Sequence, residues 1–190
     1  MTPPEEVYVS TDIECDGLIP GLHSMLSLGA AAFTPRGELL DTFTVNLAPL
    51  PDCAPLPQTM AWWQDFPEAW ARSTENPRPP GEALEGYVRW VEALPGTPVF
   101  VAYPAVFDFA FVNYYLARFV RRSPFGFSAL DLRSYAMALT GGSFGAATKA
   151  QMPAEWLPER PHTHVALDDA LAQGEWFCRM LAANRESRLP

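Results

Sequence analysis

The chain has 190 residues, of which 48% are hydrophobic and 13% aromatic, and it carries a formal net charge of −9. This length and apolar fraction argue against disorder, and they predict a single domain over residues 1–190 with its core at about 7–185. No apolar run reaches the ~20 residues that a bilayer-spanning helix needs, and the N-terminus lacks the features of a signal peptide. The acidic charge speaks against a broad basic surface for nucleic acid, although carboxylates that bind cations also contribute to it.

Three cysteines stand far apart in the sequence and form no Cys-x-x-Cys motif: Cys15, Cys53 and Cys178. Their odd number and spacing indicate reduced thiols rather than a disulfide framework or a cysteine zinc site, so we predict a cytoplasmic protein. The 20 prolines cluster at 49–57, 77–80 and 153–161, which we interpret as rigid surface connections within one domain.

The first part of the chain predicts three strands. Residues 7–9 are an apolar, β-branched and aromatic run that ends in the acids Asp12 and Glu14. Residues 24–33 predict a second strand, with small residues where another backbone can approach closely. Polar and apolar residues alternate over 38–47, which predicts a third strand with one buried face. A tight turn between the second and third strands makes them an antiparallel hairpin.

The rest of the chain alternates helices and strands. Aromatic residues fall at partly helical spacing over 58–70, and the helix predicted for 82–94 has a clear apolar face. The remaining expected elements are a strand at 98–103, a helix at 106–120, a short strand at 127–130, a helix at 132–139 and a last helix from 164 or 165 to 183. This order predicts an α/β fold, a mixed sheet of about five strands with the first strand central and helices flanking it.

Four carboxylates and one imidazole can meet at one edge of this sheet. Asp12 and Glu14 leave the same face of a strand, and such a pair is costly unless a hard divalent cation lies between them. Asp108 follows the strand 98–103 and sits in the first turn of the next helix, while His164 and Asp169 are expected on the first turns of the last helix. Two acids that simply face water are the alternative interpretation of Asp12 and Glu14.

These residues carry a resemblance to a known family. Asp12-x-Glu14, Asp108 near a helix start and His164-x-Ala166-x-x-Asp169 together resemble the DEDDh branch of the DnaQ-like 3′→5′ exonucleases. The resemblance covers about 7–185 in the right order, and it implies a ribonuclease-H-like fold. The chain length, the hairpin that starts near Met25 and the Trp62-Trp63 pair are most similar to the small bacterial exoribonucleases of this superfamily.

The resemblance implies roles for these side chains. Asp12, Glu14, Asp108 and Asp169 would ligate two Mg²⁺ or Mn²⁺ ions, ions that oxygen ligands favour over zinc. His164 would take the proton from the attacking water, a role that suits a neutral imidazole with a reference pKa of ~6.5. His162 is a second candidate base, but it lacks the five-residue spacing to an acid, so we favour His164.

The stretch after Glu14 departs from the family. Many members have Thr-Gly after the glutamate, whereas this chain has Cys15-Asp16-Gly17, which leaves the contacts to a terminal nucleotide open. The acids from Asp12 to Asp16 also resemble the start of an EF-hand loop. However, His23 occupies the position that needs a bidentate glutamate, and no helix precedes the loop, so we argue against calcium binding.

We name Gly17, Met25, Trp62 and Trp63 as candidate substrate-binding residues. The tryptophans can stack on bases or pack in the core, and adjacent helical positions point in different directions, so we expect one buried and one free. Met25, with Leu28, can wedge against terminal bases or pack within its strand.

Other side chains near these motifs have an ordinary interpretation. Phe107 and Phe111, which flank Asp108, are expected to pack in the core. Asp168 is expected to face solvent or to cap the last helix. Four basic residues can either meet phosphates of an incoming strand or form a solvated patch: Arg121, Arg122, Arg133 and Lys149.

The predicted activity is that of a metal-dependent 3′→5′ exonuclease that releases nucleoside 5′-monophosphates from single-stranded ends, with RNA preferred over DNA. The alternatives are a DNA exonuclease of the proofreading or repair type, and a nucleic-acid-binding module without catalysis. The family resemblance also implies a homodimer, which an apolar helix face at 62–70 could serve, and no membrane partner is expected.

Overall fold

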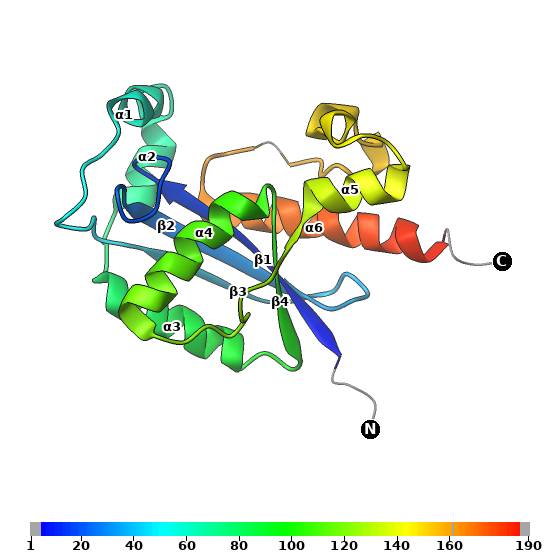
Figure 1. The fold of residues 1–190 in the computed structure, drawn as a ribbon, viewed down its shortest axis with the longest axis horizontal. Helices are drawn as coiled ribbons and strands as arrows, with labels where there is room; N and C mark the ends of the chain where they lie inside the picture. The colour runs from blue at the N-terminus through cyan, green and yellow to red at the C-terminus, as the bar shows by residue number, and fades with distance from the viewer. Residues whose placement is uncertain (1–4, 161, 187–190) are drawn as a thin grey trace.

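The computed structural model describes residues 5–160 and 162–186, and its strands form one mixed sheet in the order β3-β2-β1-β4-β5 (Figure 1). The strands are β1 (Glu6–Cys15), β2 (Met25–Phe33), β3 (Leu39–Asn46), β4 (Thr97–Ala102) and β5 (Ala129–Asp131). β1 pairs antiparallel with β2 and parallel with β4, so it is the central strand, as predicted. It is longer than the apolar run alone, and it includes both Asp12 and Glu14.

The helices follow the predicted order. They are α1 (Pro57–Trp63), α2 (Pro67–Thr74), α3 (Pro80–Glu92), α4 (Ala105–Tyr115) with a π-helical turn at Leu116–Val120, α5 (Leu132–Thr140) and α6 (Ala166–Glu186). The predicted element over 58–70 is two helices, because the backbone of Phe66 is not helical and Pro67 starts a new one. Among the helices in the described part of the chain, none has the length and apolar run that a bilayer crossing requires.

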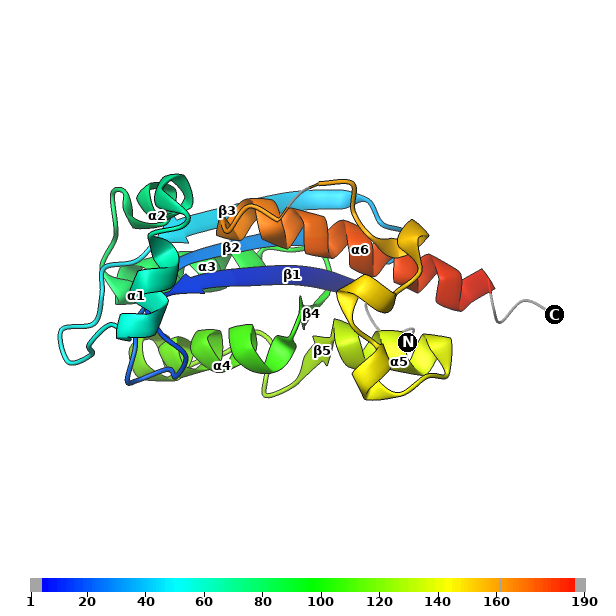
Figure 2. The same cartoon turned by 90° about the horizontal axis from the view of Figure 1, so that it is seen from above.

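The two faces of the sheet are covered by different helices (Figure 2). Val7, Val9 and Ile13 of β1 pack in one core cluster that includes side chains of α3 and α4. Tyr8 and Ser10 lie on the other face of β1. There Tyr8 packs in a second cluster with side chains of α5 and α6, and its ring centroid lies 4.7 Å from that of Phe177. Since Asp12 and Glu14 continue the series of Tyr8 and Ser10, they point to the α6 side.

The start of α6 lies directly on β2 because β2 has a glycine there. A Cβ at Gly29 would lie 2.2 Å from the carbonyl carbon of Ala166 and from the backbone nitrogen of Leu167. This confirms the expectation that small residues in the second strand allow another backbone to approach. The contact fixes the first turn of α6, and with it Asp169, over the central strands.

Gln173 joins α6 to both central strands. Its amide nitrogen donates to the Ser10 hydroxyl at 3.0 Å and to the Thr11 carbonyl at 3.1 Å, and its oxygen accepts the Tyr103 N–H at 2.7 Å. Ser10 in turn donates to the Ala170 carbonyl at 2.8 Å. The buried amide therefore holds α6 in register with the middle of β1 and with the residue that follows β4.

We expect Gly29→Ala to destabilise the protein by about 1–3 kcal/mol, because the added Cβ meets backbone rather than a movable side chain. The matched control is Gly86→Ala in α3, where the nearest atom is the Phe43 ring at 3.7 Å. That change should be neutral or stabilising by up to about 1 kcal/mol. Urea unfolding measures both, and a Gly29→Ala protein as stable as the wild type would contradict this role of Gly29.

Candidate active site

Three of the four predicted carboxylates converge on one point. Asp12, Glu14 and Asp169 each offer an oxygen, and these atoms lie within 4.8 Å of one another. Asp12 and Glu14 lie near the C-terminal end of β1, and Asp169 lies in the first turn of α6. Glu14 and Asp169 are buried, and Asp12 is half-buried.

Asp108, the fourth predicted carboxylate, reaches the site from α4. It lies in the first turn of α4, which follows β4 and its parallel pairing with β1. Its carboxylate accepts the Ile13 N–H at 3.1 Å, so it is tied to the residue between Asp12 and Glu14. Asp108 is not within the 4.8 Å group of the other three, but it is close enough to raise the pKa of Asp12 through its charge.

Three of these acids have pKa values above their ordinary range. Burial raises the pKa of Glu14 to about 8, and the charges of Asp169 and Asp108 add to this effect. Burial likewise raises the pKa of Asp108 to about 7, against the hydrogen bond from Ile13. The pKa of Asp12 lies well above its ordinary value, through burial and then through the charges of Asp108, Glu14 and Asp169.

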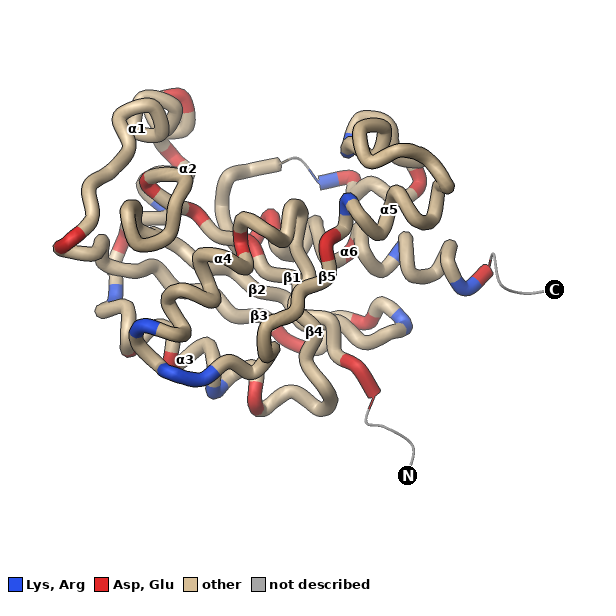
Figure 3. The backbone as a smooth tube through the Cα atoms, viewed as in Figure 1, with Lys and Arg blue, Asp and Glu red and all other residues tan. Residues whose placement is uncertain are grey.

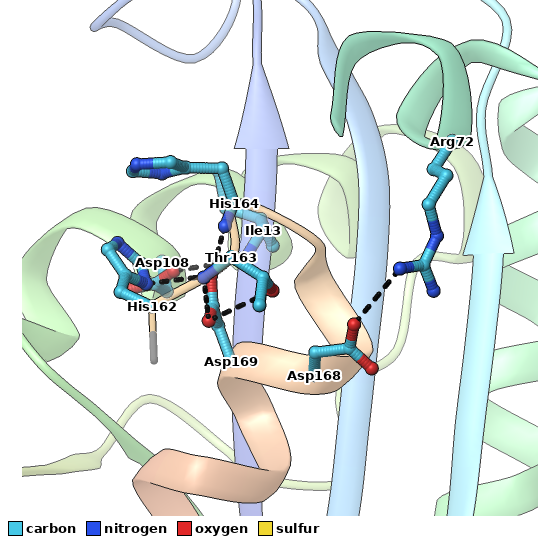
Figure 4. Close-up of polar contacts among 8 residues, drawn as sticks. All are labelled: Ile13, Arg72, Asp108, His162, Thr163, His164, Asp168 and Asp169. Atoms are coloured by element: carbon cyan, nitrogen blue, oxygen red, sulfur yellow. Dashed lines mark hydrogen bonds and ion pairs between the residues drawn. The ribbon is translucent and has the colours of Figure 1, made fainter. Parts of the chain in front are cut away.

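Asp169 is held in the opposite state. Burial alone would raise its pKa, but donors to its carboxylate outweigh burial and bring the pKa below its ordinary value. The donors are the His162 ring at 2.8 Å and the backbone N–H groups of Thr163 at 3.0 Å and His164 at 2.8 Å (Figure 4). Asp169 is therefore an ionised, fixed carboxylate around which the others gather.

The two histidines lie differently from the prediction. His164 precedes α6 instead of lying on it, and its backbone has a left-handed φ of 57°. Its ring packs against Trp62 and Phe66, at centroid distances of 4.7 and 4.3 Å. A nitrogen of this ring lies within 4.8 Å of the Asp169 carboxylate, whereas the His162 ring lies at hydrogen-bond distance from it (Figure 4). His162, which we had placed second as a candidate base, is the imidazole in contact with Asp169. His164 contacts the Asp169 carboxylate through its backbone N–H and not through its ring.

Two hollows border the carboxylates and differ in character. One, of about 270 Å³, is lined by Asp12, Asp169 and His162 together with the basic Lys149 and Arg160. The other, of about 370 Å³, contains Glu14 and mainly apolar side chains, among them Leu18, Leu56, Trp62 and Phe107. An anionic group suits the first hollow, and a flat apolar group suits the second.

The structure corrects two of the predicted substrate contacts. Met25 is 0% exposed and belongs to the core, so it packs within its strand and cannot wedge against a base. Trp63 is 3% exposed, and its indole N–H donates to the Cys15 carbonyl at 3.0 Å, so it is a packing residue. Trp62 is 38% exposed and lines the apolar hollow, in line with the expectation of one buried and one free tryptophan.

The loop after Glu14 is closed by its own residues. Asp16, which departs from the Thr-Gly pattern of the family that the sequence resembles, accepts the Ser24 N–H at 2.6 Å and so stabilises the loop. Gly17 lies under the His23 ring, where a Cβ would come within 2.1 Å of a ring carbon. Packing against His23 therefore requires a glycine at position 17, and a contact between Gly17 and substrate stays a prediction.

The charged residues near the site separate into two groups. Lys149 lies in the charged hollow, whereas Arg122 forms ion pairs with Glu85 at 2.8 Å and Glu92 at 3.1 Å, away from the site. Lys and Arg residues occur in small groups with acids between them, as expected from the net charge (Figure 3). Asp168 faces away from Asp169 and pairs with Arg72 at 3.1 Å (Figure 4).

Some residues of the site had no role in the sequence prediction. Gln173 lies four residues after Asp169, and this helical spacing is the signal that could have placed it on the same face. Phe107 was expected in the core, but it is half-buried and lines the apolar hollow, while Phe111 is buried as expected. Arg160 belongs to a proline-rich connection, where no periodicity indicates its direction.

The donor set fits a hard divalent cation. Four carboxylates supply oxygen ligands only; burial raises the pKa values of three of them, and repulsion from neighbouring carboxylates adds to this at Asp12 and Glu14. A divalent cation between these oxygens would remove that repulsion, and oxygen ligands suit Mg²⁺ or Mn²⁺.

Comparison with known proteins gives one full-length relative. No family model matches the chain. The Escherichia coli protein described as "3′-5′ DNA exonuclease Cap18" is 32% identical over 185 residues, which cover 93% of this chain and 92% of the relative.

Solved structures share the fold at low identity. The nuclease domain of 3′hExo, described as a DEDDh family member bound to rAMP, has a TM-score of 0.69 and 12% identity, and the match covers 94% of this chain and 92% of that one. The complex of E. coli ExoI with single-stranded DNA, in a zinc-bound form, has a TM-score of 0.68 and 15% identity over 97% of this chain and 42% of that one.

The raised pKa values predict how stability depends on pH. Glu14 and Asp108 have folded-state pKa values of about 8 and 7, above their unfolded values of about 4.3 and 3.9. The folded state therefore binds more protons, and the free energy of unfolding of the metal-free protein should fall by several kcal/mol, to order of magnitude, as pH rises from 6.5 to 9. This window lies above the titration of His164, whose pKa is lowered by burial and whose contribution has the opposite sign.

Urea unfolding with a chelator measures this slope, and Glu14→Gln is the control that should flatten it. Added Mg²⁺ should stabilise the protein more at pH 9 than at pH 6.5, because protons compete for the same oxygens. A stability that rises across this window in the metal-free wild type would contradict the crowding of the carboxylates.

Proposed function

Because the chain belongs to the DEDDh family of 3′→5′ exonucleases, we propose that it removes nucleotides from single-stranded 3′ ends as nucleoside 5′-monophosphates. The observation that carries this proposal is the convergence of Asp12, Glu14 and Asp169 within 4.8 Å, with Asp108 beside them. A protein that only binds nucleic acid has no use for buried carboxylates that face an anionic backbone, so this arrangement supports catalysis.

Exonucleases of this family use divalent metal ions, and we propose two ions of Mg²⁺ or Mn²⁺ for this site. Asp12 would contribute to both ions, Glu14 and Asp169 to one, and Asp108 to the other. When bound, such a pair stabilises the charge on the attacking and leaving oxygens of an in-line displacement. The hydrogen bonds from Thr163 and His164 keep Asp169 ionised, and the bond from Ile13 holds Asp108 in place.

We assign the general base to His164, on the motif His164-x-Ala166-x-x-Asp169. Burial and the neighbouring His162 lower the pKa of its ring, which keeps it neutral and able to accept a proton. A nitrogen of the ring already lies within 4.8 Å of the Asp169 carboxylate, so a rotation of the side chain away from Trp62 and Phe66 would bring it to the carboxylates. The backbone N–H of His164 stays bonded to Asp169 during such a rotation.

The two hollows suit the two parts of a nucleotide. Lys149 and Arg160 can meet phosphate oxygens of the strand in the charged hollow. Trp62 and Phe107 offer aromatic faces in the apolar hollow, where the terminal base can stack with little sequence preference. The scissile phosphate would then lie between the hollows, at Asp12 and Glu14.

Two substrates are candidates. The sequence predicts RNA over DNA, and a solved neighbour with a TM-score of 0.69 is described as recognising a histone mRNA stem-loop. The 32% identical relative is described as a DNA exonuclease, and this likeness favours DNA. The substrate sugar is read by contacts to the 2′ position, so matched oligonucleotides decide between them.

Three further proposals come from the sequence. The chain acts as one exonuclease domain, in the cytoplasm, and as a homodimer. The three cysteines are free, which suits a reducing compartment. The exposed part of Trp62, in the last turn of α1, offers one apolar surface for a partner copy, and the molar mass of the protein in solution tests the homodimer.

A degradation assay with a matched pair of variants tests the function. Asp169→Asn should reduce the rate of nucleotide release by at least ~10³-fold in Mg²⁺ or Mn²⁺, because it removes a charged ligand. Asp168→Asn is the control in the same helical turn: it breaks a surface ion pair worth about 0–1 kcal/mol and should keep the rate. The substrates are 5′-labelled RNA and DNA oligonucleotides of equal sequence. Equal rates for the two variants would refute the site.

The same assay assigns the base. His164→Ala should lower turnover by about 10²–10⁴-fold with little change in binding. His162→Ala should lower it less, since that ring serves an ion pair. A larger loss for His162→Ala would transfer the base to His162, the ring that already contacts Asp169.

A further inference from the structure

A second group of possible ligands lies beside the carboxylates and includes both histidines of the 162–165 segment. His162, His164 and Asp169 each offer one ligand atom, and these atoms lie within 4.8 Å of one another. The two imidazole rings are 4.2 Å apart between centroids, and His162 Nδ1 is 2.8 Å from Asp169 Oδ2. The proposed reaction needs only one imidazole, so it leaves His162 without a chemical role.

Two imidazoles and one carboxylate are a different donor set from the oxygen cluster. Nitrogen ligands favour zinc and other borderline transition metals, whereas Mg²⁺ prefers oxygen. We propose that His162, His164 and Asp169 form a second metal site that takes Zn²⁺, distinct from the oxygen site for Mg²⁺ or Mn²⁺. Three protein ligands and one open position are a common zinc arrangement.

The distances allow this site to close with small movements. With Zn²⁺ bonds of about 2.0–2.1 Å, ligand atoms in a tetrahedral site lie roughly 3.3 Å apart. The group spans at most 4.8 Å, so closure needs shifts of about 1.5 Å or less. The rings that must shift belong to a short segment between a proline-rich connection and α6.

The surroundings of the group support metal binding. Backbone N–H groups of Thr163 and His164 orient the Asp169 carboxylate, as outer hydrogen bonds commonly do for metal ligands. Trp62 and Phe66 form an apolar wall behind His164. The side chain of His162 is 52% exposed, so an ion has access from solvent.

Occupation of this site would stop the exonuclease. Zn²⁺ would hold His164, the proposed base, and would draw Asp169 away from the oxygen cluster that it shares. The inhibitory part of this inference rests on the proposed function, whereas the binding part does not. Zinc would therefore act as a switch that Mg²⁺ does not displace.

Direct binding tests the site without reference to activity. Metal-free protein in excess Mg²⁺ is titrated with Zn²⁺ by calorimetry, and we expect one ion per chain. His162→Gln and Asp169→Asn should each weaken binding at least tenfold. His23→Gln is the control, because His23 is the third histidine of the chain and lies in the 16–23 loop. Equal binding by His162→Gln and wild type, or loss of Zn²⁺ binding in excess Mg²⁺, would overturn the site.

Spectroscopy on the wild type guards against variants that misfold. X-ray absorption at the zinc edge should show imidazole nitrogen in the first shell, and a shell of oxygen alone or of sulfur would overturn the assignment. For the switch, the rate of each variant with Zn²⁺ is divided by its own rate in Mg²⁺ alone. Zinc should inhibit the wild type at least tenfold and His162→Gln little, and equal inhibition of both would refute the switch.

Discussion

Repulsion among buried carboxylates is the interaction on which this structure depends. Asp12, Glu14 and Asp169 bring oxygens within 4.8 Å, and Asp108 adds a fourth charge nearby. At such separations each like-charge pair costs about 3–4 kcal/mol at an effective dielectric constant of about 20. A fold of marginal stability keeps such a cluster only where it serves a function. Divalent cations bound between the carboxylates would replace this repulsion by attraction, so the same cluster would bind them tightly.

The fold supplies rigid supports for this cluster. β1 is central, and beyond its pairing with β4 it holds Asp12 and Glu14 opposite Gly29 and Ser27 of β2, while the Ile13 N–H between them donates to Asp108. Gly29 lets the first turn of α6 rest on β2, and Gln173 ties the next turn to β1 and β4. Each support fixes one direction of movement of Asp169 relative to β1. The backbone of the histidine segment is held to Asp169 by the N–H groups of Thr163 and His164, so only the side chain of His164 must turn to approach the oxygen cluster or to join His162 in a zinc site.

Periodicity was enough to predict the sheet and its central strand, and motif spacing predicted that Asp12, Glu14 and Asp169 would lie together, because these features depend on residue type along the chain. The direction of single side chains could not be predicted in this way. Met25 and Trp63 are packing residues, and each is held by a hydrogen bond. The Met25 backbone N–H donates to the Tyr115 hydroxyl, and the Trp63 indole N–H donates to the Cys15 carbonyl. Likewise, His164 lies outside α6 because its own N–H caps the Asp169 carboxylate. Such contacts join residues far apart in sequence, or depend on one backbone angle, and neither leaves a periodic signal.

The central claim is that the crowded acids are a site for two divalent cations. The most direct measurement is the number of Mn²⁺ ions that the metal-free protein binds at pH 8, determined by electron paramagnetic resonance of the free ion. The account predicts two ions per chain in the wild type and a loss of both in Asp12→Asn, since Asp12 serves both ions. A wild type that binds no Mn²⁺, or an Asp12→Asn variant that binds as many ions as the wild type, would contradict it.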